Sequence, residues 1–320
     1  MPRFIVYGAG AVGGVIGARL HEHGHDVALI ARGAHGAAIA RDGLRIEWAG
    51  ADATVHRLAV AADPAELDLA GEVVVILTVK SQDTVAALDR LAAVAGRHVA
   101  VACAQNGVAN ERAALRRFAR TYAICVMLPA THLVPGMIVA HSSPVAGSLD
   151  VGRHPGGVDE TAELIAAALR SAGFASQARP DMRRWKHAKL LRNLDNATRA
   201  LLGPPPAGAD LSRRMRDEAL AAFAAAGIEF VGDDEYDAHH RSIVRTAGQP
   251  QTLGSSWQSL ARGSAQTEAD HLNGEIALLG RLHGVPTPVN ALLAEVAAEA
   301  ARDGIEAGSM TEAQLLARLR

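Results

Sequence analysis

The sequence predicts an α/β fold in which a doubly wound parallel sheet is followed by a second, all-helical domain. Three observations support this prediction. Apolar, strand-like runs alternate with helical segments up to about residue 180, such runs nearly vanish afterwards, and a glycine-rich turn joins the first predicted strand to the first predicted helix. A chain of 320 residues is long enough for about two domains, which we expect at 1–179 and 180–320.

The first domain is predicted to begin with a strand, a helix and a strand. Apolar runs at 4–8 and 26–31 flank a helical segment at 11–23, which is the parallel βαβ arrangement. Further strands of the sheet are predicted at 73–78, 99–104 and 122–128. Strand-like pieces at 138–140 and 148–151 predict an antiparallel finish to this sheet.

The second domain is predicted to consist of helices only. They are expected at 185–202, 211–225, 236–245, 268–282 and 289–301. The three prolines at 204–206 should end the first of these helices, because proline cannot continue a helix.

Composition excludes several classes of protein. With 32 Lys and Arg against 34 Asp and Glu, the chain lacks the basic excess that nucleic acids or anionic membranes require, and 3% aromatic residues leave few rings for base stacking. Cys103 and Cys125 have no ligand-spaced partners, so neither a disulfide framework nor a metal site is expected. His239 and His240 lack a third ligand nearby and are expected at the surface. Without a signal-like or membrane-spanning run, a cytoplasmic location is expected.

The turn Gly8-Ala9-Gly10-Ala11-Val12-Gly13 has the Gly-x-Gly-x-x-Gly pattern between a predicted strand and helix. Gly8 would permit the tight turn, Gly10 would let the backbone approach a pyrophosphate, and Gly13 would let the helix pack on the strand. An ordinary glycine-rich turn is the alternative. In this context the pattern predicts a Rossmann-type dinucleotide-binding domain.

Two basic residues favour NADP over NAD. Arg32 stands where an NAD enzyme would present a carboxylate to the ribose, and a guanidinium there can bind a 2′-phosphate instead. Lys80 follows the predicted strand at 73–78 and could add a second positive charge, unless it is a solvated loop lysine. Asn106 follows the strand at 99–104, where the sheet's crevice binds ligands, although an ordinary Asn-Gly turn is the better explanation from the residues alone.

The helix predicted at 185–202 carries Lys186, Lys189, Asn193 and Asn196 on one stripe. Cations and amides make a poor core face, so this stripe can line a cleft in which a lysine acts as general acid. A solvated basic face is the alternative. Farther along the chain, Glu268 at the start of a predicted helix is explained by capping and the helix dipole alone.

Taken together, these pieces resemble the ketopantoate reductase family along essentially the whole chain. The matching pieces are the glycine turn, Val79-Lys80, Gln105-Asn106-Gly107, Lys189-Leu190-Leu191-Arg192-Asn193, Ser255-Ser256 and Thr267-Glu268-Ala269-Asp270-His271-Leu272-Asn273-Gly274. The glycine turn is shared by many dehydrogenases, but the ordered set is specific.

The resemblance implies that NADPH gives hydride to the keto carbon of a 2-keto acid while Lys189 protonates the developing alkoxide. Asn106, Asn193 and Ser256 would hold the substrate, and Glu268 would orient its hydroxyl group. Arg32 and Lys80 match positions that hold the 2′-phosphate. One departure concerns the family's second asparagine, which would fall at Ala197, whereas Asn196 lies one place earlier and is offered as a substrate ligand.

The interpretation is therefore a cytoplasmic, NADPH-dependent reductase of a small anionic 2-keto acid, with 2-dehydropantoate, the precursor of pantoate in pantothenate biosynthesis, as favoured substrate. Reduction of another 2-keto acid or an imine on the same scaffold is an alternative. A non-catalytic NADP-binding sensor is another. No nucleic acid, membrane or metal is expected, and whether the protein forms a homodimer stays open.

Overall fold

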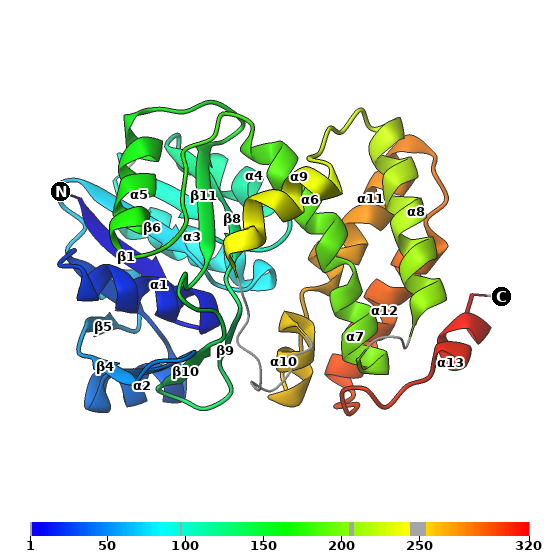
Figure 1. Cartoon of the computed structure of the whole chain (residues 1–320), viewed down its shortest axis with the longest axis horizontal. Helices are drawn as coiled ribbons and strands as arrows, with labels where there is room; N and C mark the ends of the chain where they lie inside the picture. The colour runs from blue at the N-terminus through cyan, green and yellow to red at the C-terminus, as the bar shows by residue number, and fades with distance from the viewer. Residues whose placement is uncertain (1, 97, 205–207, 244–253, 320) are drawn as a thin grey trace. The chain divides into compact units, whose positions relative to one another are not determined.

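The computed structural model describes residues 2–96, 98–204, 208–243 and 254–319 (Figure 1). The chain divides into two compact units. The first unit comprises Met1–Gln105, Ala109–Trp185 and Asp233–Gln249, and the second comprises Asn106–Val108, Lys186–Gly232 and Pro250–Arg320. The expected domains, 1–179 and 180–320, stay a prediction.

A seven-stranded sheet forms the centre of the first unit, in the order β11-β8-β7-β6-β1-β2-β5. Its strands are β1 (Arg3–Tyr7), β2 (Val27–Ile30), β5 (Ala59–Ala61), β6 (Val73–Leu77), β7 (Ala100–Cys103), β8 (Thr121–Met127) and β11 (Ser148–Arg153). All neighbours pair in parallel except β11, which is antiparallel to β8. The order reverses at β1, so the doubly wound prediction is confirmed.

Helices pack on this sheet and bury the side chains of both its faces. They are α1 (Ala11–Glu22), α2 (Gly33–Asp42), α3 (Thr84–Val94), α4 (Asn110–Leu115) and α5 (Glu160–Ser171), with 3-10 turns η1 (Pro64–Glu66) and η2 (Ser81–Asp83). In β1, Phe4 and Val6 join one apolar cluster, while Ile5 and Tyr7 join the cluster on the other face. Burial on both faces explains why these strands are continuous apolar runs in the sequence.

A smaller, four-stranded sheet corrects part of the prediction. It consists of β4 (Thr54–His56), β3 (Leu44–Trp48), β10 (Met137–Ala140) and β9 (Ala130–Thr131), in that order. The antiparallel finish to the large sheet is right for β11 but wrong for β10, which pairs in parallel with β3. The sequence pattern missed β3 because the strand is short and only partly buried, so its apolar signal is weak.

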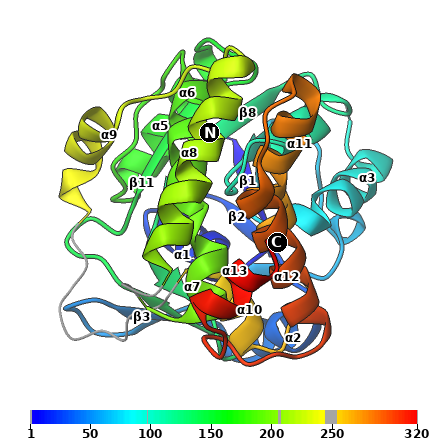
Figure 2. The same ribbon diagram turned by 90° about the vertical axis from the view of Figure 1, so that its right-hand side faces the viewer.

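The second unit is all-helical, as expected. Its helices are α7 (Asp195–Leu202), α8 (Ala209–Ala225), α10 (Ser255–Ala261), α11 (Asn273–His283), α12 (Pro288–Arg302) and α13 (Glu312–Ala317), with 3-10 turn η4 (Ala269–His271). Helix α6 (Met182–Asn193) contributes the part that begins at Lys186. Helices α8, α11 and α12 lie side by side (Figure 2) and enclose a core that includes Phe223, Ile276 and Val296.

Two predicted helices differ from those observed. The helix expected at 185–202 is divided at Leu194 into α6 and α7. The helix expected from Glu268 begins only at Asn273, because Leu272 leaves the helical region with φ −115° and ψ −82°. Helix α7 ends at Leu202, before the predicted proline stop, and the prolines at 205 and 206 lie outside the described residues.

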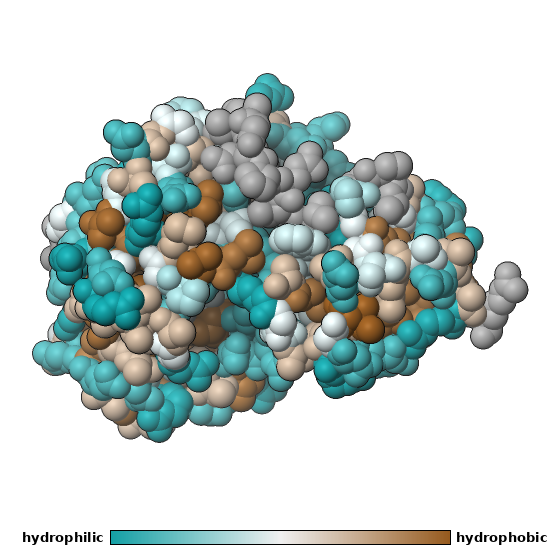
Figure 3. Space-filling model, turned by 90° about the horizontal axis from the view of Figure 1, so that it is seen from below, coloured by the Kyte–Doolittle hydropathy of each residue, from teal (hydrophilic) through white to brown (hydrophobic). Residues whose placement is uncertain are grey.

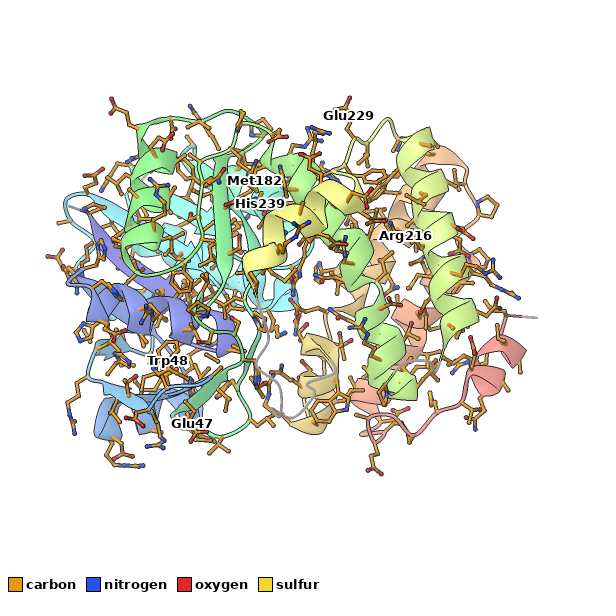
Figure 4. All side chains as sticks on the ribbon, viewed as in Figure 1. Glu47, Trp48, Met182, Arg216, Glu229 and His239 are labelled. Atoms are coloured by element: carbon orange, nitrogen blue, oxygen red, sulfur yellow. The ribbon has the colours of Figure 1, made fainter. Side chains whose placement is uncertain are left out.

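The segment with α9 (Asp233–His239) and η3 (His240–Ser242) belongs to the first unit. The expectation of a surface histidine pair is wrong, since His240 is buried and the side chain of His239 is 17% exposed. His239, labelled in Figure 4, lies on α9. Its Nε2 is 2.6 Å from the buried Asp150 Oδ2, which also accepts a bond from Arg179 Nε at 2.6 Å. The rest of the helix predicted at 236–245, from residue 244, lies outside the described residues.

The surface shown in Figure 3 is mostly hydrophilic, and its apolar side chains gather in small groups. In the part of the chain that the structure describes, no helix is long and apolar enough to cross a bilayer. Nor do the described residues include a cluster of three or more His, Cys, Asp or Glu side chains that could hold a metal ion.

Candidate functional site

The glycine turn after β1 is shaped by two crowded glycines and one open glycine. Thr78 Oγ1 donates to Gly8 O at 2.6 Å, and Gly8 has φ +109°, which favours glycine. A methyl group on Gly13 would collide with Gly8 O and Thr78 Oγ1, whereas one on Gly10 would meet no described atom within 4 Å. The turn is therefore fixed by packing at both ends and leaves space at Gly10, as a nucleotide cradle requires.

Two cations follow the strands on either side of β1. Arg32 is the N-cap of α2, directly after β2, and is exposed; Lys80 follows β6 and is half-buried. Gly8 N donates to Ile30 O at 3.0 Å, which joins the turn to the end of β2. Burial raises the pKa of Tyr7, the last residue of β1, and the charge of Arg32 acts in the opposite direction. The arrangement fits an anionic cofactor that carries a 2′-phosphate.

A buried polar network holds the segment that carries Lys80. Gln105 Nε2 donates to Val79 O at 2.7 Å and to Thr84 Oγ1 at 2.8 Å. Thr84 Oγ1 in turn donates to Asn110 Oδ1 at 2.8 Å, and Asn110 Nδ2 donates to Ser81 Oγ at 3.2 Å. Sequence reasoning missed Ser81, Thr84 and Asn110. Each of them alone resembles an ordinary helix-start or loop residue.

Asn106 follows β7 by three residues and is half-buried. The next residue, Gly107, has φ +80°, a conformation that favours glycine, so the Asn-Gly turn expected from the sequence is present. The turn does not exclude a ligand role for the Asn106 side chain, because the turn uses the backbone.

The stripe on α6 and α7 is not a solvated basic face. Lys186, Asn193 and Asn196 are buried, with 4%, 6% and 8% of their surfaces exposed, and Lys189 is half-buried. That alternative is therefore wrong. Amides and lysines are expensive to desolvate, so their burial on one stripe makes this stripe a candidate for ligand contact.

Asn196 lies in the first turn of α7, two residues after Leu194. A methyl group on Gly254 would lie 2.7 Å from Asn196 Oδ1, so this amide faces the residue that precedes α10. Gly254 has φ +98°, and α7 packs on α10. Ala197, at the position of the family's second asparagine, is 1% exposed and belongs to the apolar core. Asn196, not residue 197, thus reaches the start of α10.

Ser255, Ser256 and Glu268 gather at the same place. Ser255 Oγ donates to Glu268 Oε2 at 3.3 Å, and Glu268 is 4% exposed. Ser256 is 1% exposed, and neither its Oγ nor Asn193 Nδ2 has a hydrogen-bond partner among the described residues. Nearly all buried polar atoms are paired in folded proteins, by protein groups, water or ligands. Other buried atoms of the described chain, such as Ser148 Oγ and Thr198 Oγ1, also lack a protein partner. Asn193 Nδ2 and Ser256 Oγ are therefore two candidates for a bond from a ligand or a water. The family resemblance predicted a role for Ser256, whereas the contact between Ser255 and Glu268 is seen only in the structure.

The chain matches two family models in sequence order. Residues 4–156 match Ketopantoate reductase PanE/ApbA, and residues 181–301 match Ketopantoate reductase PanE/ApbA C terminal. The chain belongs to the ketopantoate reductase PanE/ApbA family. The resemblance seen in the sequence motifs is thereby confirmed.

Relatives of this family member match it over nearly their whole length. A 2-dehydropantoate 2-reductase of Mesorhizobium japonicum is 31% identical, covering 92% of this chain and 96% of the relative. One from Halobacterium salinarum is 29% identical and covers 94% of this chain and 100% of the relative.

Solved structures share the fold. A PanE/ApbA family ketopantoate reductase from Ralstonia eutropha has a TM-score of 0.80 at 27% identity, covering 94% of this chain and 99% of its own. A ternary structure of D-mandelate dehydrogenase, with a TM-score of 0.80 at 23% identity, shows likeness of fold alone; it covers 94% of this chain and 98% of its own.

Proposed function

We propose that this ketopantoate reductase family member is an NADPH-dependent 2-dehydropantoate 2-reductase that forms pantoate. The observation that carries the proposal is a pair of buried polar atoms in the second unit, Asn193 Nδ2 on α6 and Ser256 Oγ on α10, that lack partners among the described residues. It occurs in a chain 31% identical to a relative named for this reaction. A small anionic 2-keto acid suits such a polar, largely aliphatic site. A cytoplasmic location stays a prediction.

The first unit would hold the cofactor. NADPH, when bound, supplies the hydride that reduces the keto carbon. The space at Gly10 and the N-terminus of α1 suit the pyrophosphate, because unpaired backbone N–H groups and the helix dipole favour an anion there. Arg32 would bind the 2′-phosphate with its planar guanidinium, and Lys80 would add a second positive charge.

Lys189 would act as the general acid. Its ammonium Nζ holds a proton that it can donate to the oxygen of the reduced carbonyl. That oxygen gains negative charge as the carbon is reduced, so a nearby ammonium stabilises the transition state more than the neutral ketone. Lys189 is half-buried, which limits competition from water for this charge.

The amide and hydroxyl side chains would bind and orient the substrate. Asn106, Asn193 and Ser256 would hold its carboxylate, carbonyl and distal hydroxyl, and Asn196 would approach from the α7 side of the α10 start. Glu268, which already accepts a bond from Ser255 Oγ, can accept a second one from a substrate hydroxyl.

The test uses purified full-length protein with NADPH and 2-dehydropantoate, followed by the loss of NADPH absorbance. Wild type should turn over, and Lys189→Ala should lower kcat by about 10²–10⁴-fold, the range for a lost general acid. NADPH affinity should stay unchanged in this variant. Arg183→Ala, an exposed change on α6, is the control. Absence of wild-type turnover would refute the substrate, and full activity of Lys189→Ala would refute the role of that lysine.

One observation favours a second candidate, a reductase of another 2-keto acid. Ala197 is packed in the core where the family's second asparagine is expected, and Asn196 reaches the α10 start from a different backbone position. A panel of 2-keto acids assayed with saturating NADPH separates the two candidates. The substrate is 2-dehydropantoate if it gives the highest kcat/KM.

A further inference from the structure

His35, on the first turn of α2, bridges two backbone segments of the first unit. Gly136 N donates to its Nδ1 at 2.9 Å, and its Nε2 lies 2.7 Å from Ala9 O. Ala9 stands between Gly8 and Gly10 in the nucleotide turn. The side chain is half-buried, and its ring centroid is 4.0 Å from that of His132. None of the sequence patterns singled out this histidine.

The two backbone partners fix the state of the imidazole. A backbone N–H group can only donate, so Nδ1 must carry a lone pair towards Gly136. A carbonyl oxygen can only accept, so Nε2 must carry the proton that is donated to Ala9 O. The neutral Nε2–H tautomer satisfies both contacts at once, and no other protonation state does.

This contact orients the peptide between Ala9 and Gly10. Because the peptide is planar and trans, its N–H points opposite to its C=O. Ala9 O points towards His35, so the N–H of Gly10 points away from it. Gly10 is the N-cap of α1, where helices leave N–H groups without intrahelical partners, and a side chain at Gly10 would enter open space.

The imidazole is itself held from the other side. Gly136, which has φ +80°, also accepts a hydrogen bond at its oxygen from Arg45 N at 3.0 Å, so it is tied to β3. The ring of His132 from the same loop lies against His35. The His35 side chain is thus held by the bond at Nδ1 and by the ring of His132 before any cofactor binds. Little conformational entropy of this side chain is then lost when the cofactor binds.

We propose that His35 is a positioning residue for the cofactor: its Nε2–H holds Ala9 O so that the Gly10 N–H faces the pyrophosphate. The inference rests on the proposed use of NADPH. It assigns His35 no contact with the reacting atoms. Its removal should therefore weaken binding of the dinucleotide and leave the chemical step unchanged.

Two amide variants separate this role from simple anchoring of the loop. In His35→Gln, the amide Nε2 can replace the imidazole Nε2 as donor to Ala9 O. In His35→Asn, the shorter amide can replace only Nδ1, as acceptor from Gly136 N. His35→Ala removes both contacts, and His23→Ala, at an exposed histidine at the other end of α1, is the control.

The primary readout is the dissociation constant of NADPH, measured by fluorescence titration of each full-length variant. His35→Ala and His35→Asn should raise it about 5- to 10-fold, as expected for one lost hydrogen bond, and His35→Gln should stay within about twofold of wild type. NADH binding should weaken by the same factor, because the pyrophosphate is common to both. Arg32→Ala should weaken NADPH binding only. The value of kcat at saturating NADPH should not change.

Three results would overturn the inference: unchanged NADPH affinity in His35→Ala, wild-type affinity in His35→Asn with weakened affinity in His35→Gln, or a loss confined to kcat. Melting temperatures of the unliganded variants are measured separately, and if His35→Ala does not fold, the Gln and Asn variants decide. A wild-type protein that binds no NADPH would refute the proposed function, and the inference with it.

Discussion

Buried polar side chains behave differently behind Lys80 and around the start of α10. In the first unit, Gln105, Thr84 and Asn110 are hydrogen-bonded to one another and to the segment that carries Lys80. In the second unit, Asn193 Nδ2 and Ser256 Oγ are buried without a hydrogen-bond partner among the described residues.

The difference separates a scaffold from a binding surface. A closed network fixes a backbone segment, and removing one member leaves the others unsatisfied, which costs stability. A buried polar atom without a protein partner lowers stability by its desolvation cost, and a ligand or a water that supplies the missing bond offsets this cost. Substitutions in the network behind Lys80 should therefore lower stability, and substitutions of Asn193 or Ser256 should weaken substrate binding.

The largest expected effect is a loss of stability in the glycine turn, where a packed glycine and an open glycine can be compared. Gly13→Ala should lower the free energy of unfolding by about 2–3 kcal/mol, since the methyl group collides with Gly8 O and Thr78 Oγ1. Gly10→Ala, at φ −68° and with no described atom near the added methyl, should keep stability within about 0.5 kcal/mol while weakening NADPH binding. Urea unfolding and NADPH titration measure the two effects. Equal stability of both variants would contradict the crowding argument.

The closed network can be broken at its centre. Thr84→Val keeps the shape of the side chain but removes the hydroxyl group that accepts from Gln105 and donates to Asn110. Unfolding free energy should fall by about 1–3 kcal/mol, because two buried polar groups lose a partner. Thr84→Ser keeps the hydroxyl group and is the matched control. If Val and Ser variants were equally stable, the network would not stabilise this segment.

A serine pair on α10 tests the open group. Ser256→Ala should keep or slightly raise stability, because it removes a buried hydroxyl group that has no partner among the described residues, and should raise KM for the keto acid by about tenfold through a lost substrate bond. Ser259 is also buried, but its Oγ donates to Ser255 O at 3.1 Å. Ser259→Ala should therefore lower stability slightly and leave KM unchanged. Steady-state kinetics and urea unfolding measure both effects. If Ser259→Ala raised KM and Ser256→Ala lowered only stability, the assignment of Ser256 to substrate binding would be refuted.

The smallest expected effect is a pH dependence of the first unit. Burial lowers the pKa of His56 from its ordinary value of 6.5, and its Nε2 lies 2.7 Å from Thr54 Oγ1. The fold thus favours the neutral ring, and this contribution to stability is present above pH 6.5 and is lost as the pH falls through the lowered folded pKa. When the pH is lowered from 7 to 5, the melting temperature of wild type should fall more than that of His56→Gln. An equal fall in both would refute this assignment.

The fold class could be predicted because its signals are local. Strands buried on both faces are continuous apolar runs, such as Val73–Leu77, and the crowded Gly13 stands at a fixed spacing from Gly8. The strand Leu44–Trp48 was missed because it is only partly buried, so its residues do not form such a run. Helix boundaries failed where a single residue changes the backbone direction, as Leu272 does before α11.

Motif and spacing named Arg32, Lys80 and Lys189 as candidates, and only the family resemblance named Glu268. Neither predicted the surroundings of these side chains. His239 shows why: Asp150 and Arg179, which contact its ring, lie far away in the sequence, and no short sequence pattern predicts a contact between distant segments.

By itself, the sequence determined the strand-helix-strand start, the buried parallel strands, the chemistry of the nucleotide turn and the change to an all-helical second part, since each depends on neighbouring residues. Only the tertiary structure decided that β10 pairs with β3, that Asn196 faces Gly254, and that His35 holds Ala9 O. It also decided which buried polar atoms are paired. These outcomes depend on contacts between segments that are remote along the chain, and such contacts form only when the apolar faces of all the elements are buried together.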